Sequence, residues 1–245
     1  RRSRLRRACR RFHAGCGIMA GMNETTAKPA GADAALVIAG PAGRIEAAYD
    51  EAEATPRPVL AILCHPLPTE GGTMHNKVVT MAARALRESG IATLRFNFRG
   101  VGGSEGRFDD GNGELDDLRA VVAWARARHP DKALWLAGFS FGAWVSLRGA
   151  VELGAAALIS IAPPVGRSWE FANITLPSVP WLVIQGDADE IVDAGAVRDW
   201  AASLPSPPVL VEIPDSSHFF HRKLMDLRGA LKNGIRGWLP PPAAA

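Results

Sequence analysis

The stretch Gly138-Phe139-Ser140-Phe141-Gly142 decides how the rest of the sequence is interpreted. It follows an apolar run at 133–138 that is typical of a buried strand, and it opens a helical pattern at 141–153. A serine between two glycines at a strand-to-helix turn matches the G-x-S-x-G pattern, in which a sharp turn lifts the serine hydroxyl clear of the sheet. Ser140 is therefore a candidate nucleophile, and a plain tight turn is the alternative.

Strand-like and helix-like segments alternate on both sides of this turn. Most of the strand-like segments are short apolar runs without alternation, which is typical of parallel strands covered on both faces. We predict strands at 34–39, 44–49, 58–64, 91–97, 133–138, 156–161, 181–185 and 209–213. Helical patterns lie between them, at 76–89, 114–128, 141–153, 194–203 and 222–238. This alternation predicts an α/β fold with helices on both faces of the sheet.

The first two predicted strands have only the link Gly40-Pro41-Ala42-Gly43 between them. So short a link favours an antiparallel hairpin, which we place at one edge of the sheet.

A serine hydroxyl is a weak nucleophile and needs a base and a group that orients the base. In open α/β sheets such groups collect beyond the carboxyl ends of the strands. The strand at 181–185 is followed by two aspartates, Asp187 and Asp189, and by Glu190. The strand at 209–213 is followed by His218, which lies on the loop, whereas His221 begins the last helical pattern. His218 is therefore the favoured base, and the residues themselves leave the choice between the aspartates open.

Several motifs of the chain occur together in one known superfamily. They are Cys64-His65-Pro66-Leu67-Pro68 with Gly71-Gly72-Thr73-Met74, Arg95-Phe96-Asn97-Phe98-Arg99-Gly100-Val101-Gly102, the serine turn, Gly186-Asp187-Ala188-Asp189, and Ser217-His218-Phe219-Phe220. With these motifs the chain from Val59 to the last helix resembles the α/β-hydrolase superfamily. More narrowly, it resembles the small, poorly characterised bacterial α/β hydrolases with a serine nucleophile and a short cap.

The resemblance implies the α/β-hydrolase fold, a mostly parallel central sheet of about eight strands with an antiparallel N-terminal hairpin and helices on both faces. Many members carry a cap between the strands that we place at 156–161 and 181–185. Here residues 162–180 have room for a short helix but not for a lid domain, so we expect an open cleft.

The resemblance also implies a catalytic triad. Ser140 would be the nucleophile and His218 the base, and Asp189, the fourth residue of G-x-x-D, would be the acid. Asp187 is the second choice, and its commoner role is to cap the loop by accepting backbone N–H bonds. Glu190 is expected to face solvent.

An oxyanion hole needs two N–H donors. One is the amide that follows the nucleophile, Phe141. The other should come from the loop after the strand at 58–64, where Leu67 is the candidate because Pro66 and Pro68 have no N–H. His65 is expected to fix this loop by hydrogen bonding and to belong to the substrate site. Trp169 and Phe171 are expected to flank the cleft, with packing within their own segment as the alternative.

These residues predict a serine hydrolase that cleaves a small carboxylic ester through an acyl-enzyme. The rivals are a serine peptidase or a thioesterase with the same triad, and a non-catalytic binding protein on a hydrolase fold.

No metal or organic cofactor is expected. Asp215, His218 and His221 lack the spacing of known metal sites, and Glu105 stands where a dinucleotide-binding G-x-G-x-x-G needs glycine. Arg99 is expected to hold the Gly100–Gly103 loop to Asp109 or Asp110.

The composition is that of a globular protein, with 245 residues, 47% hydrophobic and 22% charged, and a mean hydropathy of +0.02. No apolar run approaches the roughly 18 residues of a membrane-spanning helix. The three cysteines, Cys9, Cys16 and Cys64, are too few and scattered for a disulfide framework, which favours a cytoplasmic location. We predict a small-molecule substrate and no nucleic-acid partner, and the sequence does not indicate the oligomeric state.

The net charge of +3 depends on the N-terminal segment. Without residues 1–21, which hold seven arginines, 21 basic residues stand against 25 acidic ones. We expect residues 1–33 to be a disordered or non-native extension, with Met19 or Met22 as the native start. Residues 34–239 are expected to form one α/β-hydrolase domain, and residues 240–245 a frayed tail.

Overall fold

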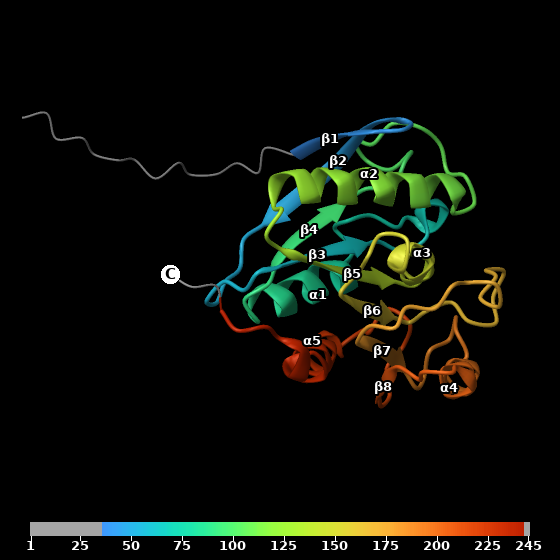
Figure 1. Cartoon of the computed structure of the whole chain (residues 1–245). Coiled ribbons are helices and arrows are strands. Elements are labelled where there is room, and N and C mark those ends of the chain that lie inside the picture. Colours follow the sequence, from blue (N-terminus) through green and yellow to red (C-terminus); the bar gives the residue numbers. More distant parts are fainter. Residues whose placement is uncertain (1–35, 243–245) are drawn as a thin grey trace, which may run out of the picture. The chain divides into compact units, whose positions relative to one another are not determined.

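The structure, a computed structural model, describes residues 36–242. Within this range eight strands form one sheet in the order β1-β2-β4-β3-β5-β6-β7-β8 (Figure 1). The strands are β1 (Leu36–Gly40), β2 (Gly43–Asp50), β3 (Val59–Cys64), β4 (Ala92–Phe96), β5 (Ala133–Phe139), β6 (Ala157–Ile161), β7 (Trp181–Gly186) and β8 (Val209–Ile213). β2 runs antiparallel to β1 and β4, and every other pair is parallel. The predicted α/β fold with an N-terminal hairpin is confirmed.

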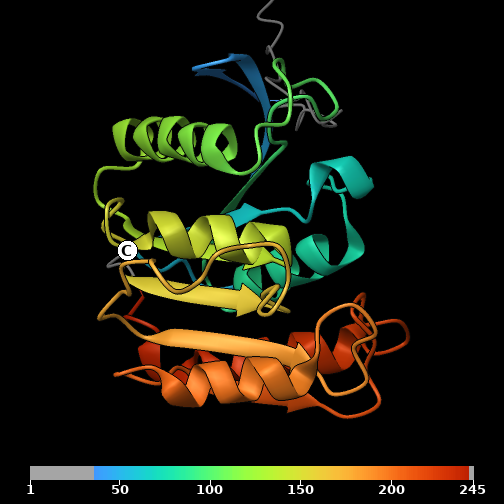
Figure 2. The same cartoon turned by 90° about the vertical axis from the view of Figure 1, so that its right-hand side faces the viewer.

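Helices cover both faces of this sheet. α2 (Asn112–Arg128), α3 (Phe141–Ala150) and α4 (Ala194–Ser203) lie on one face, and α1 (Lys77–Arg87) and α5 (Leu224–Gly234) on the other (Figure 2). The side chains of the central strand β3 point alternately to the two faces of the sheet, so they pack into two separate hydrophobic cores. Leu60, Ile62 and Cys64 belong to the core under α2 and α3, and Val59, Ala61 and Leu63 to the core over α1 and α5.

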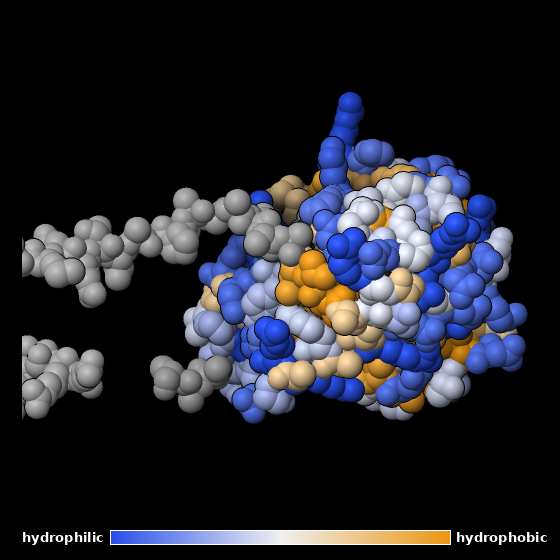
Figure 3. Space-filling model, turned by 90° about the horizontal axis from the view of Figure 1, so that it is seen from above, coloured by the Kyte–Doolittle hydropathy of each residue, from blue (hydrophilic) through white to orange (hydrophobic). Residues whose placement is uncertain are grey.

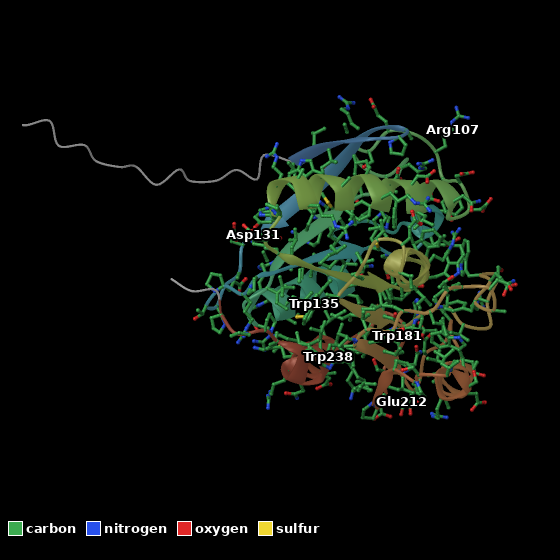
Figure 4. The ribbon with its side chains drawn as sticks, viewed as in Figure 1. Arg107, Asp131, Trp135, Trp181, Glu212 and Trp238 are labelled. Carbon is green, nitrogen blue, oxygen red and sulfur yellow. The ribbon has the colours of Figure 1, made fainter. Side chains whose placement is uncertain are left out.

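The last predicted helix, 222–238, is shorter than expected and divided. α5 ends at Gly234, and a separate 3₁₀ turn at Arg236–Trp238 follows it. In that turn Trp238 packs edge-on against Trp135 of β5, with ring centroids 6.5 Å apart (Figure 4). The turn at Arg236–Trp238 is thus fixed on the α1–α5 face.

The segment between β6 and β7 contains no helix or strand. Residues 162–180 leave the carboxyl end of β6 and return across the α3–α4 face to the start of β7 (Figure 2). The expected absence of a lid domain is confirmed, and the short helix for which this segment has room does not form.

Arg99 corrects one prediction. Its guanidinium pairs with Asp117 of α2 at 2.8 Å, and not with Asp109 or Asp110. The Asp117 side chain is buried, and its carboxylate also accepts the Arg99 amide at 2.9 Å. The hydrogen bonding between the Arg99 guanidinium and the Asp117 carboxylate is the largest cause of the raised Arg99 pKa. Asp109 instead accepts the Gly113 amide in the first turn of α2.

The face formed by β1, β2 and α2 is mostly hydrophilic and includes a smaller hydrophobic area (Figure 3). None of the helices between residues 36 and 242 is long and apolar enough to cross a membrane.

The described residues include only part of the two chain ends for which predictions were made. Residues 1–33, and with them Cys9 and Cys16, lie outside the described residues, as do residues 243–245. Within the expected tail, the Pro240 carbonyl accepts a hydrogen bond from the Arg57 guanidinium, so the chain is still held at this point.

Candidate active site

Ser140 lies on a strained turn between β5 and α3. Its backbone has φ 53° and ψ −121°, a region that non-glycine residues rarely occupy unless the surroundings enforce it. The turn is so tight that a Cβ on Gly138 would collide with the backbone of Gly142, and one on Gly142 with the carbonyl of Cys64. Both glycines of the motif are therefore required, and the half-buried serine remains at the carboxyl end of β5.

Three of the predicted site residues are joined by hydrogen bonds. His218 Nε2 lies 3.1 Å from Ser140 Oγ, and His218 Nδ1 lies 2.8 Å from Asp189 Oδ2. A carboxylate can only accept, so Nδ1 carries the proton and the neutral ring leaves Nε2 free to accept from the serine hydroxyl. A hydroxyl held in this way can lose its proton as it attacks an electrophile.

Every strong acceptor position of Asp189 is used. Oδ1 accepts the amides of Ile191 at 2.8 Å and Val192 at 2.7 Å. Oδ2 accepts from His218 and from the Gln185 side chain at 2.9 Å. Burial acts to raise the Asp189 pKa, but the bonds from His218 and the two amides outweigh it, so the pKa is lowered. The carboxylate therefore stays ionised and holds the imidazole in one orientation.

Of the two neighbouring acids, only Asp187 departs from its expected role. Asp187 is exposed, and its carboxylate accepts no hydrogen bond from the described chain, so the loop-capping role expected for it is filled by Asp189. Glu190 is exposed as expected, yet its carboxylate accepts the backbone amide of His218 at 3.1 Å. It therefore ties the histidine loop to the loop after β7.

Gln185 was not among the predicted site residues. It is the fully buried polar residue at the end of the apolar strand β7, four residues before Asp189. A glutamine in an otherwise apolar run was the available signal, because a buried amide needs a partner.

The two predicted oxyanion donors border the same cavity as Ser140. Within residues 36–242, the amides of Leu67 and Phe141 donate no hydrogen bond to the protein. The Leu67 carbonyl accepts the amides of Glu70 at 3.1 Å and Gly72 at 3.0 Å, which closes the loop after β3 into a turn. Both N–H groups are thus available to a bound oxygen.

Comparison with known proteins identifies the family. A family model described as serine aminopeptidase, S33, matches residues 62–178. An uncharacterised protein of Rickettsia prowazekii is 35% identical over 205 residues, which cover 79% of this chain and 85% of that protein. An α/β serine hydrolase without a lid from Xanthomonas campestris is 62% identical and superposes with a TM-score of 0.83, covering 86% of this chain and 96% of its own. The chain belongs to the α/β serine hydrolases.

A second solved structure supports the same assignment. An α/β serine hydrolase homologue from Coxiella burnetii is 45% identical, with a TM-score of 0.79 and coverage of 82% of this chain and 96% of that one.

His65 of this hydrolase lies outside the cavity, which corrects its expected place in the substrate site. It is fully buried and absent from the cavity lining. Its Nε2 accepts the Phe98 amide at 3.0 Å and its Nδ1 donates to the Pro66 carbonyl at 2.7 Å. The ring therefore joins the loop after β3 to the loop after β4, which agrees with the other expectation, that His65 fixes its loop.

These two bonds require a neutral ring, and the protonated form is disfavoured. Burial lowers the His65 pKa to about 4 from its usual 6.5. As the pH falls, the ring takes up a proton near pH 6.5 in the unfolded chain but only near pH 4 in the folded protein. His65 therefore contributes stability above pH 6.5 that is lost as the pH falls toward 4.

Lowering the pH from 7.5 to 5 is expected to cost about 2 kcal/mol of unfolding free energy through His65. Urea unfolding of wild type and His65→Asn at both pH values measures this loss. The variant should be less stable at pH 7.5 but should lose less on acidification. His129, whose pKa burial also lowers, is present in both proteins and cancels in the comparison. Equal losses in the two proteins would contradict the role of His65.

The hydrolase has a cavity of about 360 Å³ at Ser140 and His218. Trp169, Ile191 and Phe219 give it apolar walls, and Ile191 and Phe219 are 37% and 38% exposed, which is high for such large apolar side chains. Trp169 thus borders the cavity as expected. Phe171 does not border it, because its ring packs on Trp200 of α4 at 5.2 Å.

His221 and Asp215 are exposed residues of the hydrolase. The described chain contains no group of three or more His, Cys, Asp and Glu side chains arranged to hold a metal ion. In the glycine-rich loop after β4, the Gly103 amide donates to the Glu46 carboxylate at 2.7 Å, which holds this loop to β2.

Proposed function

We propose that this α/β serine hydrolase cleaves carboxylic esters through an acyl-enzyme, with Ser140, His218 and Asp189 as its catalytic triad. The observation that carries the proposal is the hydrogen-bonded chain from Asp189 through His218 to Ser140, which ends in an open cavity. All three groups come from loops of one sheet, so we propose residues 34–239 as a single catalytic domain. We also propose that this domain acts in the cytoplasm.

In the first step the Ser140 oxygen attacks the ester carbonyl carbon while His218 Nε2 takes the hydroxyl proton. The negative oxygen of the tetrahedral intermediate is held by the amides of Leu67 and Phe141, and such donors contribute roughly 3 kcal/mol each. Asp189 stabilises the imidazolium that forms. His218 then gives the proton to the leaving alcohol oxygen, and the carbon–oxygen bond to that alcohol breaks.

In the second step a water molecule attacks the acyl-enzyme. His218 takes one proton of the water as its oxygen bonds to the acyl carbon, and returns this proton to Ser140 Oγ as the acid leaves. The free enzyme is restored, and the products are one carboxylic acid and one alcohol.

The open cavity favours small esters or the exposed ends of larger molecules. Residues 162–180 form no lid, so no domain has to open before a substrate reaches Ser140. A peptidase remains the second candidate, because the family model that matches the chain is described as a serine aminopeptidase.

We expect short-chain p-nitrophenyl esters to be hydrolysed faster than matched acyl-thioesters and aminoacyl anilides. The amine of an amide is a poorer leaving group than the phenol of these esters, so its departure depends more strongly on proton transfer from His218. The measurement is kcat/KM for the three substrate classes with one common acyl group. A higher value for the anilide would reverse the assignment in favour of the peptidase.

A further inference from the structure

A second cavity lies beside the first, on the α3–α4 face of the hydrolase. It has a volume of about 600 Å³ and lies between residues 166–176 and the C-terminal end of α4. Six large apolar side chains line it, and all of them are half-buried: Trp169, Phe171, Ile174, Leu176, Trp200 and Leu204. Polar side chains also line it, namely Arg167, Ser168, Glu170 and Ser203. The hollow therefore offers apolar surface both from residues 169–176 and from α4, with polar side chains between.

The two cavities meet at Arg167 and Trp169, which border both of them. Trp169 is held at this junction by ring contacts with Phe141 at 4.9 Å and Trp144 at 4.8 Å. The Trp144 indole also donates to the Glu170 carbonyl at 2.9 Å. Residues 162–180 are therefore fixed to α3 beside Trp169, one of the two lining residues that the cavities share.

The opposite wall is fixed as well. Trp200 of α4 packs against Phe171 at 5.2 Å and against Trp181 of β7 at 5.6 Å, and Figure 4 shows Trp181 near α4. The Trp181 indole donates to Ser160 Oγ of β6 at 3.0 Å. This aromatic wall of the hollow is therefore anchored to the sheet.

The proposed chemistry determines which part of a substrate points toward this hollow. Around the tetrahedral carbon, one bond goes to Ser140 Oγ, the oxyanion faces the Leu67 and Phe141 amides, and the leaving oxygen must face His218. Phe219 and Ile191 belong to the same side of the cavity as His218. Of the lining that remains, Pro164 and Trp169 offer apolar contact to an acyl substituent, whereas Glu70 and Asn76 are polar.

We propose that the second cavity binds the apolar end of a medium-length acyl chain whose carboxyl carbon is attacked by Ser140. The proposal rests on the proposed function, because it assigns the acyl side from the roles of His218 and the two amides. Each methylene that moves out of water contributes about fourfold to kcat/KM. The hydrolase should therefore prefer medium-length acyl chains to acetyl groups.

Filling the second cavity tests this assignment. Ser203, on α4, borders the second cavity and not the first, so Ser203→Trp places a large ring in the hollow. We expect the ratio of kcat/KM for p-nitrophenyl octanoate to that for p-nitrophenyl acetate to fall at least tenfold. Ala202→Trp is the matched control, because Ala202 is its exposed neighbour on α4 and does not border the cavity. The control should keep the wild-type ratio.

A second variant covers the case in which Ser203→Trp fails to fold, as judged by circular dichroism. Ser168→Trp fills the cavity from the segment between β6 and β7 and should lower the same ratio. An unchanged ratio in the folded variants would overturn the proposal. Octyl acetate separates the two ends of the ester, and a selective loss of its hydrolysis would assign the cavity to the alcohol and also overturn the proposal. Failure of the proposed function is distinct, because wild type would then show no Ser140-dependent hydrolysis of p-nitrophenyl acetate.

Discussion

Replacing Ser140 with alanine is expected to lower kcat for p-nitrophenyl acetate by about 10⁴-fold or more, as losses of a triad nucleophile do in other enzymes. The substitution removes the only atom that can form the acyl-enzyme and leaves the rest of the hydrogen-bonded chain in place. Alanine has the same difficulty as serine with a φ of 53°, so the turn keeps its strain and the fold is expected to survive.

The matched control for this loss is Ser146→Ala, on the same helix. Ser146 is fully buried and donates to the Ala143 carbonyl at 3.0 Å, so it shares the residue type but not the position at the cavity. Its variant should retain activity within about twofold. Ester hydrolysis that persists in Ser140→Ala at a tenth of the wild-type rate or more would remove Ser140 as the nucleophile.

Asp189→Asn is expected to lower kcat by about 10⁴-fold, because it selects the wrong tautomer of His218. The Ile191 and Val192 amides both point at Oδ1, so the asparagine oxygen must take that place. Its NH₂ group then faces His218 Nδ1, which must become an acceptor, and the proton moves to Nε2. An Nε2–H cannot take the proton of Ser140. The Gln185 oxygen has no hydrogen-bond partner among residues 36–242 and can turn to accept from the new NH₂ group, so the fold should tolerate the change.

Asp187→Asn is the control for this prediction. The two aspartates are two residues apart in one loop, but the Asp187 carboxylate is exposed and accepts no hydrogen bond from the described residues. Steady-state kinetics of both variants should therefore differ by several orders of magnitude. Equal losses would mean that the loop, and not the Asp189 carboxylate, determines the rate.

The fold was predictable because each strand can be recognised from its own stretch of sequence. From β2 to β8 each predicted strand agrees with the structure to within one residue at either end, since the buried strands are apolar runs bounded by turn residues. The last helix was predicted too long, because the pattern does not reveal that Gly234 and Ile235 end α5 before Trp238 turns back onto β5.

The positions of the site residues along the chain were predictable, but their contacts were not. Ser140, Asp189 and His218 follow strand ends, and strand ends of a parallel sheet lie at one edge. Phe171 lies in an irregular segment, where no periodicity indicates which way a side chain points. Its contact with Trp200 could therefore not be foreseen. The Arg99–Asp117 pair likewise depends on how α2 is rotated against the loop after β4.

Labelling with a fluorophosphonate probe tests whether the imidazole of His218 makes the hydroxyl of Ser140 reactive. Such a probe forms a covalent bond only with an activated serine, and peptide mapping identifies the residue that carries it. We expect one label per chain, on Ser140, and no label on Ser140→Ala. Folded wild-type protein that stays unlabelled, or that carries the label on another serine, would contradict it and favour a binding protein on a hydrolase fold.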